Sequence, residues 1–159
     1  MVEMPVTPIM AGSSLDIQYE LVGQRENFWS IKFNVMGYAD GAAHPYHYSI
    51  TVNYDLANGR VVNLSDVFLP DSNYLQVISD YCKAQLSTRD IGFGDGFGEG
   101  AEPLPENYQR WNVSDAGLVI TFDEYQVAPY AAGAQIVVIP FSELGQVLNP
   151  QGPLAPYLP

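Results

Sequence analysis

Apolar and polar side chains alternate at every second position through much of the first third of the chain. A period of two places successive side chains on opposite faces of a strand, so the pattern predicts half-buried antiparallel strands. We expect these strands near residues 15–22, 28–37 and 47–55. Their apolar members are Leu15, Ile17, Tyr19 and Leu21, then Trp29, Ile31, Phe33 and Val35, then Tyr48, Ile50, Val52 and Tyr54.

Three further strands are expected. Asn58-Gly59 is a pair that tolerates the positive φ of a hairpin turn, and Val61 and Val62 follow it as a return strand. A turn at 114–117 precedes an alternating strand near 118–123. The apolar run 136–139 is typical of a strand near 135–140 that is covered on both faces.

One long helix is predicted at residues 72–87. Asp71 or Ser72 is a suitable N-cap, and the 3.6-residue spacing points one face toward a core. That face consists of Leu75, Ile78, Cys82 and Leu86. Ser142 is placed to cap a short helix at 143–148, ahead of a Pro-rich end.

The predicted fold class is therefore α+β, with an antiparallel sheet, one main helix packed on it and a short C-terminal helix. We expect one domain at 15–149, a flexible N-terminal segment at 1–14 and a Pro-rich tail at 150–159. The glycine-rich stretch at 89–107 is expected to be a long mobile loop.

Charge narrows the class of partner. The chain of 159 residues carries 6 Lys+Arg against 18 Asp+Glu, which gives a formal net charge of −12. Nucleic-acid binding depends on cations that displace counterions, so no nucleic acid is expected. An anionic membrane surface would repel the chain, no run approaches the length of a membrane span, and residues 1–12 lack the features of a signal peptide. Any charge steering would favour basic partners.

The residue types that support catalysis or metal binding are few. No Gly-x-Ser-x-Gly elbow occurs, and Pro45 separates His44 from His47, which disfavours a helical zinc pair. Asp123 and Glu124 are adjacent at a strand end, so their side chains are expected to point to opposite faces. The acids of the glycine-rich loop, Asp95, Glu99 and Glu102, do not have the spacing of an EF-hand. We expect no catalytic residue, metal or cofactor.

The 11 tyrosines of the chain are the remaining indication of a binding surface. Tyr46, Tyr48, Tyr125 and Tyr130 cluster around two predicted turns, and loop aromatics provide large contact areas at small entropic cost. Tyr48 and Tyr125 lie on or beside strands, which favours burial, whereas the position of Tyr130 leaves burial and exposure open. Pro129 restricts the backbone before Tyr130, so a stiff turn is expected there.

Several segments together resemble the DUF3298 domain family. They include 41–45 (Gly-Ala-Ala-His-Pro), 62–68 (Val-Asn-Leu-Ser-Asp-Val-Phe) and the most specific, 120–133, which leads into 138–141. The family usually shows Gly-Gly-Ala-His-Gly, so the first alanine and Pro45 depart from its pattern. The resemblance extends from about Ile17 to Leu148.

The resemblance implies an exported, extracytoplasmic bacterial domain without catalytic activity. The family includes the C-terminal domain of the anti-sigma factor RsiV, and resemblance to that domain implies lysozyme binding. Domains of this family also accompany some peptidoglycan deacetylases. The expected partner is therefore a basic protein such as lysozyme or a cell-wall glycan, and the alternative is an enzyme or accessory domain acting on the cell-wall glycan. The expected binding residues are Pro129, Tyr130, Tyr125, His44 and Tyr46.

Overall fold

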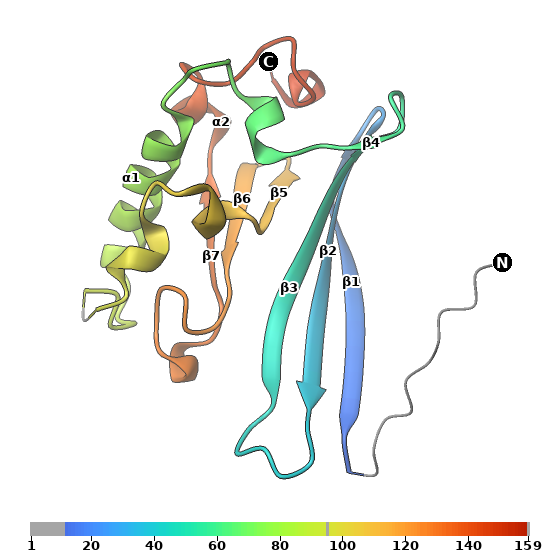
Figure 1. The fold of residues 1–159 in the computed structure, drawn as a ribbon. Coiled ribbons are helices and arrows are strands. Elements are labelled where there is room, and N and C mark those ends of the chain that lie inside the picture. The colour runs from blue at the N-terminus through green and yellow to red at the C-terminus, as the bar shows by residue number, and fades with distance from the viewer. Residues whose placement is uncertain (1–11, 95, 159) are drawn as a thin grey trace, which may run out of the picture.

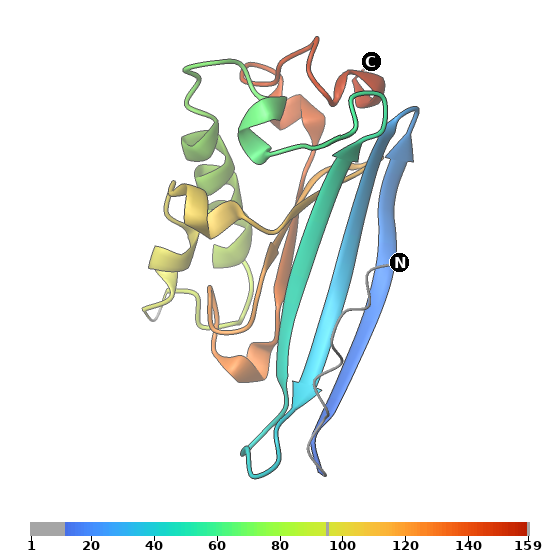
Figure 2. The same cartoon turned by 45° about the vertical axis from the view of Figure 1, so that its right-hand side comes forward.

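The computed structural model describes residues 12–94 and 96–158. It has three layers, which both views show: helix α1 (Tyr74–Ser87), a small three-stranded sheet beside it, and a longer four-stranded sheet on the far side (Figures 1 and 2). The α+β class is confirmed. The predicted strands are divided between two antiparallel sheets, where the sequence pattern had suggested one.

The long sheet has the order β1-β2-β3-β4 and is a simple antiparallel meander. Its strands are β1 (Ser14–Arg25), β2 (Phe28–Tyr38), β3 (Tyr46–Asp55) and the short β4 (Arg60–Val61). The register shifts between Leu21 and Gly23. A Cβ at Gly23 would overlap the Val113 carbonyl oxygen, so glycine allows β1 to approach the small sheet there.

The small sheet has the order β5-β6-β7 and supports most of the core. Its strands are β5 (Trp111–Ser114), β6 (Gly117–Phe122) and β7 (Gln135–Ile139). In β6 every residue is buried, whereas β7 alternates, with Ile136 and Val138 exposed. The prediction that 136–139 is covered on both faces is therefore wrong, because helix α1 packs on one face of an otherwise open edge strand.

The long sheet turns its polar row, not its apolar row, toward the small sheet. Ser30 Oγ donates to Asn53 Oδ1 at 2.7 Å, and Asn112 Nδ2 of β5 donates to Ser30 Oγ at 2.9 Å. Asn53 Nδ2 donates to the Trp111 carbonyl at 2.9 Å. These buried polar groups satisfy one another, which is the condition for burying them.

The apolar row consequently lies on the opposite side, which we call the outer face. Ile17 is 57% exposed and Tyr19 77% exposed on β1. Tyr48, expected in the core, is 40% exposed. The period of two therefore identified the strands but assigned the solvent side incorrectly, because hydrogen bonding to β5 determines which row turns inward.

Helix α1 begins later than predicted. Asn73 occupies the N-cap position, without a side-chain cap bond, in place of Asp71 or Ser72. Ile78, Cys82 and Leu86 are fully buried as expected, but Leu75 is only partly buried.

The C-terminal end also differs from its prediction. Helix α2 spans Phe141–Leu144 and its N-cap is Pro140, so Ser142 lies within the helix. Leu154 and Tyr157, in the Pro-rich segment, are buried in the core. Residues 1–11 of the expected flexible N-terminal segment lie outside the described residues.

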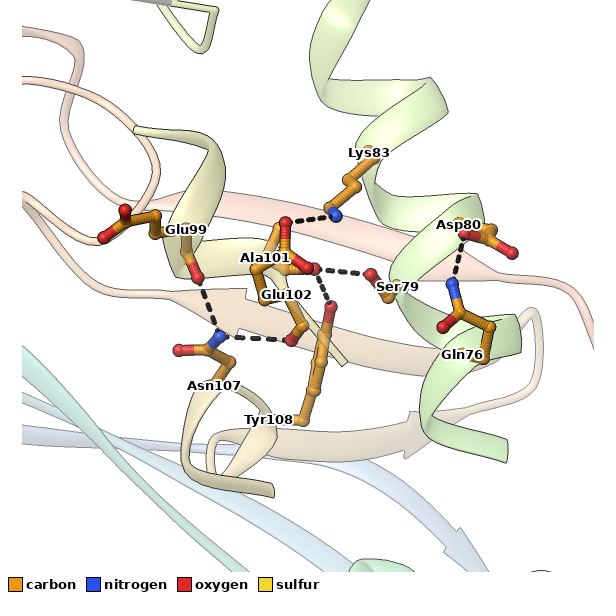
Figure 3. A network of polar contacts seen from close by, with 9 residues as sticks. All are labelled: Gln76, Ser79, Asp80, Lys83, Glu99, Ala101, Glu102, Asn107 and Tyr108. Carbon is orange, nitrogen blue, oxygen red and sulfur yellow. Dashed lines mark hydrogen bonds and ion pairs between the residues drawn. The ribbon is translucent and has the colours of Figure 1, made fainter. Parts of the chain in front are cut away.

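The second half of the 89–107 stretch is a fixed structure. The Ala101 carbonyl accepts hydrogen bonds from Ser79 Oγ and Tyr108 Oη, both at 2.6 Å, and Lys83 pairs with Glu102 at 2.7 Å (Figure 3). Asn107 Nδ2 donates to the Glu99 and Glu102 carbonyls. Two 3₁₀ helices, Gly98–Ala101 and Pro105–Tyr108, are held against α1 in this way, so the expectation of a mobile loop is wrong here.

Candidate functional site

Two segments far apart in sequence meet at one end of the molecule. They are the connection between β2 and β3, which ends at Pro45, and the connection between β6 and β7, which contains Tyr130. Tyr130 Oη donates a hydrogen bond to the Pro45 carbonyl oxygen at 3.0 Å. The rings of His44 and Tyr130 have centroids 4.2 Å apart and are inclined by 32°. The two predicted turns therefore form one surface.

We call the surface of His44, Tyr125, Pro129 and Tyr130 the aromatic patch. The Tyr125 and Tyr130 ring centroids are 5.7 Å apart. His44, Tyr125 and Pro129 are exposed, whereas Tyr130 is half-buried beneath them. The fifth predicted residue, Tyr46, is not part of the patch, because it lies over Gly37 and stacks on Tyr48 at the outer face.

Tyr130 is held as a rigid part of the patch. Pro129 has φ −62° and ψ 157°, and a 3₁₀ helix, Tyr130–Ala132, begins directly after it. Burial raises the pKa of the Tyr130 phenol, and the nearby Glu124 carboxylate raises it further. The phenol therefore stays protonated and can donate to Pro45 at neutral pH.

Tyr125 is exposed and has a strained backbone. Its φ is +67°, in the left-handed region that favours glycine. It lies in a turn closed by the Gln126 N–H, which donates to the Asp123 carbonyl at 3.1 Å. The side chain is 58% exposed, so the expectation of a core position is wrong. Strain at a non-glycine residue is found preferentially at functional sites.

The two carboxylates beside the patch already have partners. Asp123 accepts the Ser49 N–H at Oδ1 (3.0 Å) and pairs through Oδ2 with Arg110 Nε (2.7 Å). Glu124 Oε1 lies 3.1 Å from His47 Nδ1, without the alignment of a hydrogen bond. The carboxylates face different partners, as the alternation of a strand end requires.

A cleft of about 270 Å³ lies between the long sheet and the connection from β6 to β7. Its wall on the long sheet is the polar row, including Gln18, Lys32 and Asn34, and Asp123 lines it from the connection between β6 and β7. Sequence reasoning did not select Lys32 or Asn34. Their alternation with apolar residues was visible, but the pattern did not indicate that this row faces inward.

Within 12–94 and 96–158, no group of three or more His, Cys, Asp or Glu side chains could hold a metal ion. No helix in the same ranges is long and apolar enough to cross a membrane. Asp95 lies outside the described residues.

Comparison with known proteins confirms the resemblance stated from the sequence. Residues 65–142 match the family model described as "Protein of unknown function (DUF3298)". The chain is 30% identical over 141 residues to the peptidoglycan-N-acetylmuramic acid deacetylase PdaC of Bacillus subtilis. This match covers 87% of this chain and 30% of PdaC. The chain is also 27% identical over 104 residues to an esterase of Mycobacterium tuberculosis. This second match covers 65% of this chain and 45% of the esterase.

Solved structures share the fold. A DUF3298 family member from Bacteroides fragilis superposes with a TM-score of 0.73 at 21% identity, covering 91% of this chain and 58% of that one. A DUF3298 family protein from Pseudomonas aeruginosa superposes with a TM-score of 0.70 at 19% identity. The match covers 87% of this chain and 63% of that one. The chain therefore spans less than half of the curated relatives and about three fifths of these structures.

Proposed function

Starting from a chain that carries a DUF3298 domain, we propose that it is a non-catalytic recognition domain of the bacterial cell envelope that binds a basic, lysozyme-like protein through the aromatic patch. The observation that carries the proposal is the convergence of His44, Tyr125 and Tyr130 on one rigid, partly exposed surface. Ordered aromatic groups contribute much of the energy of protein interfaces at little entropic cost.

Charge supports a basic partner. The chain has a net charge of −12, and long-range attraction of this kind mainly accelerates encounter. Asp123 and Glu124 have partners within the molecule, so they contribute to the field of the surface more than they offer free contacts. The attraction should therefore weaken as salt rises, while the contacts of the aromatic rings persist.

An extracytoplasmic location is part of the proposal. Its support is the relationship to PdaC, whose name places its activity on peptidoglycan. A non-catalytic role is supported by the engagement of the nearby carboxylates: Asp123 has a partner on each oxygen, which leaves neither free as a general base.

A second candidate function follows from the same relative. The chain corresponds to 30% of PdaC, so it is also suited to be an accessory domain that positions a wall-modifying enzyme on glycan. Pull-down with insoluble peptidoglycan separates this function from the first. Retention on peptidoglycan without affinity for lysozyme would favour the accessory role.

Calorimetric titration with hen egg-white lysozyme tests the first proposal. Binding should survive physiological salt and should weaken about tenfold or more in Tyr125→Ala and Tyr130→Ala. Tyr19→Ala is the matched control, because Tyr19 is exposed on the outer face. Cytochrome c, another small basic protein, controls for charge alone. Equal binding of cytochrome c and lysozyme, or unchanged binding by both patch variants, would contradict the proposal.

A further inference from the structure

Lys32 is exceptional among the cationic side chains. The chain has six Lys and Arg residues against 18 carboxylates. Four of them form ion pairs with a carboxylate, and Arg89 donates to Gln135 Oε1 and the Ile136 carbonyl. Among residues 12–94 and 96–158, the Lys32 side chain has neither an ion pair nor a hydrogen bond. The residue as a whole is only 8% exposed, but its ammonium group keeps contact with solvent.

The unpaired ammonium group of Lys32 is available to a ligand. A lysine whose stem is buried and whose charged end reaches solvent keeps its hydration until an anion from outside replaces it. With three carboxylates for every cation, a partner for Lys32 would have been easy to provide within the chain. Lys32 instead lines the cleft, so a ligand from outside can supply the missing partner.

The strand register places further polar groups beside Lys32. Asn34 is two residues along β2 on the same face and is paired with Gln18 of β1 and Ser49 of β3. All three line the cleft together with Lys32. Amide and hydroxyl groups of this kind form hydrogen bonds with the hydroxyl and amide groups of a sugar.

The carboxylates near the cleft leave room for an anion at Lys32. Both oxygens of Asp123 have partners in Ser49 and Arg110. Asp16 lines the same cleft, but it is paired with Met36, four residues from Lys32 along β2, which corresponds to about 13 Å. Glu20 lies opposite Lys32 in the register, but it is exposed and no ion pair joins the two.

We propose that this cleft binds a carboxylate-bearing sugar, with the carboxylate on the Lys32 ammonium and the sugar on the amides of Asn34 and Gln18. The site is separate from the aromatic patch and goes beyond the proposed protein recognition. Either proposal can therefore fail without the other.

Two sugars that differ in the decisive group test the site. N-acetylmuramic acid carries a lactyl carboxylate that N-acetylglucosamine lacks. In an NMR titration, N-acetylmuramic acid should shift the signals of Lys32, Asn34 and Gln18 and should bind at least about tenfold more tightly than N-acetylglucosamine.

Variants assign the effect to Lys32. Lys32→Met should abolish the preference for the carboxylate, and Lys32→Arg should retain part of it. Lys83→Met is the matched control, because Lys83 pairs with Glu102 away from the cleft. Equal affinity for both sugars in the unaltered protein, or an unchanged preference in Lys32→Met, would overturn the proposal. If Lys32→Met does not fold, the comparison of the two sugars and Lys32→Arg still decides it.

Discussion

The Tyr130 hydroxyl and the Pro45 carbonyl, 85 residues apart in sequence, are joined by a hydrogen bond of 3.0 Å. This contact fixes the connection between β6 and β7 against the start of β3, and the His44 ring packs on Tyr130 beside it. The aromatic patch is consequently a property of two loops held together. Changes to this contact should alter both loops at once.

Tyr130→Phe should loosen both loops while retaining the ring. Loss of the hydroxyl leaves the Pro45 carbonyl to water, so backbone amides in both segments should exchange faster. Hydrogen exchange measured at residues 43–48 and 128–133 checks this. Faster exchange confined to 128–133 would show that the hydrogen bond does not couple the loops.

Tyr125 allows strain and recognition to be separated. Tyr125→Gly and Tyr125→Ala both delete the ring, but glycine alone accepts φ +67° without steric cost. We expect the glycine variant to be more stable than the alanine variant by about 1 kcal/mol in chemical denaturation. Both should lose affinity for lysozyme equally. Greater stability of the alanine variant would mean that the left-handed conformation is not maintained in solution.

The helix face gives a graded prediction. Ile78→Ala removes a fully buried side chain and should cost about 2–5 kcal/mol of unfolding free energy. Leu75→Ala should cost less, because Leu75 is only partly buried. Urea denaturation of the two variants compares them. A larger loss of unfolding free energy for Leu75→Ala than for Ile78→Ala would mean that α1 is rotated about its axis, with Leu75 on the buried face.

Alkaline pH should destabilise the fold through Cys82. Burial raises the pKa of the Cys82 thiol to about 12, whereas an unfolded thiol titrates near 8.5. The unfolded chain then loses a proton that the folded chain keeps, so stability is fully present below about pH 8.5 and falls as pH rises toward 12. Buried Tyr108, whose pKa burial also raises, acts in the same direction.

Denaturation curves at successive pH values measure this loss. Cys82→Ala should flatten the dependence between about pH 8.5 and 10, below the titration of ordinary tyrosines. In the native protein the thiol should also be unreactive toward a disulfide reagent at pH 8, because the reactive species is the thiolate. Rapid native labelling would show that Cys82 is accessible.

The strands and the main helix could be predicted because their periodicities are local properties of the sequence. The side of the long sheet that faces inward could not, since it depends on Ser30 and Asn53 meeting Asn112 of another sheet. The order at Ala101 was missed for the same reason: its partners Ser79 and Tyr108 are brought together by tertiary packing.

The candidate site was found in part. Turn chemistry and the family resemblance selected His44, Tyr125, Pro129 and Tyr130, which the structure brings together. Tyr46 was selected by proximity in sequence, but strand alternation turns it to the outer face. Lys32 carries no local signal, because its place in the cleft exists only in the folded chain.

Binding of lysozyme at the aromatic patch is the main proposal for this chain. An NMR titration of the labelled protein with hen egg-white lysozyme at physiological salt measures this most directly. If the patch binds lysozyme, the signals of residues 43–46 and 124–132 should change most, while those around Tyr19 on the outer face should remain unchanged. Changes centred on the outer face, or no change at all, would contradict it.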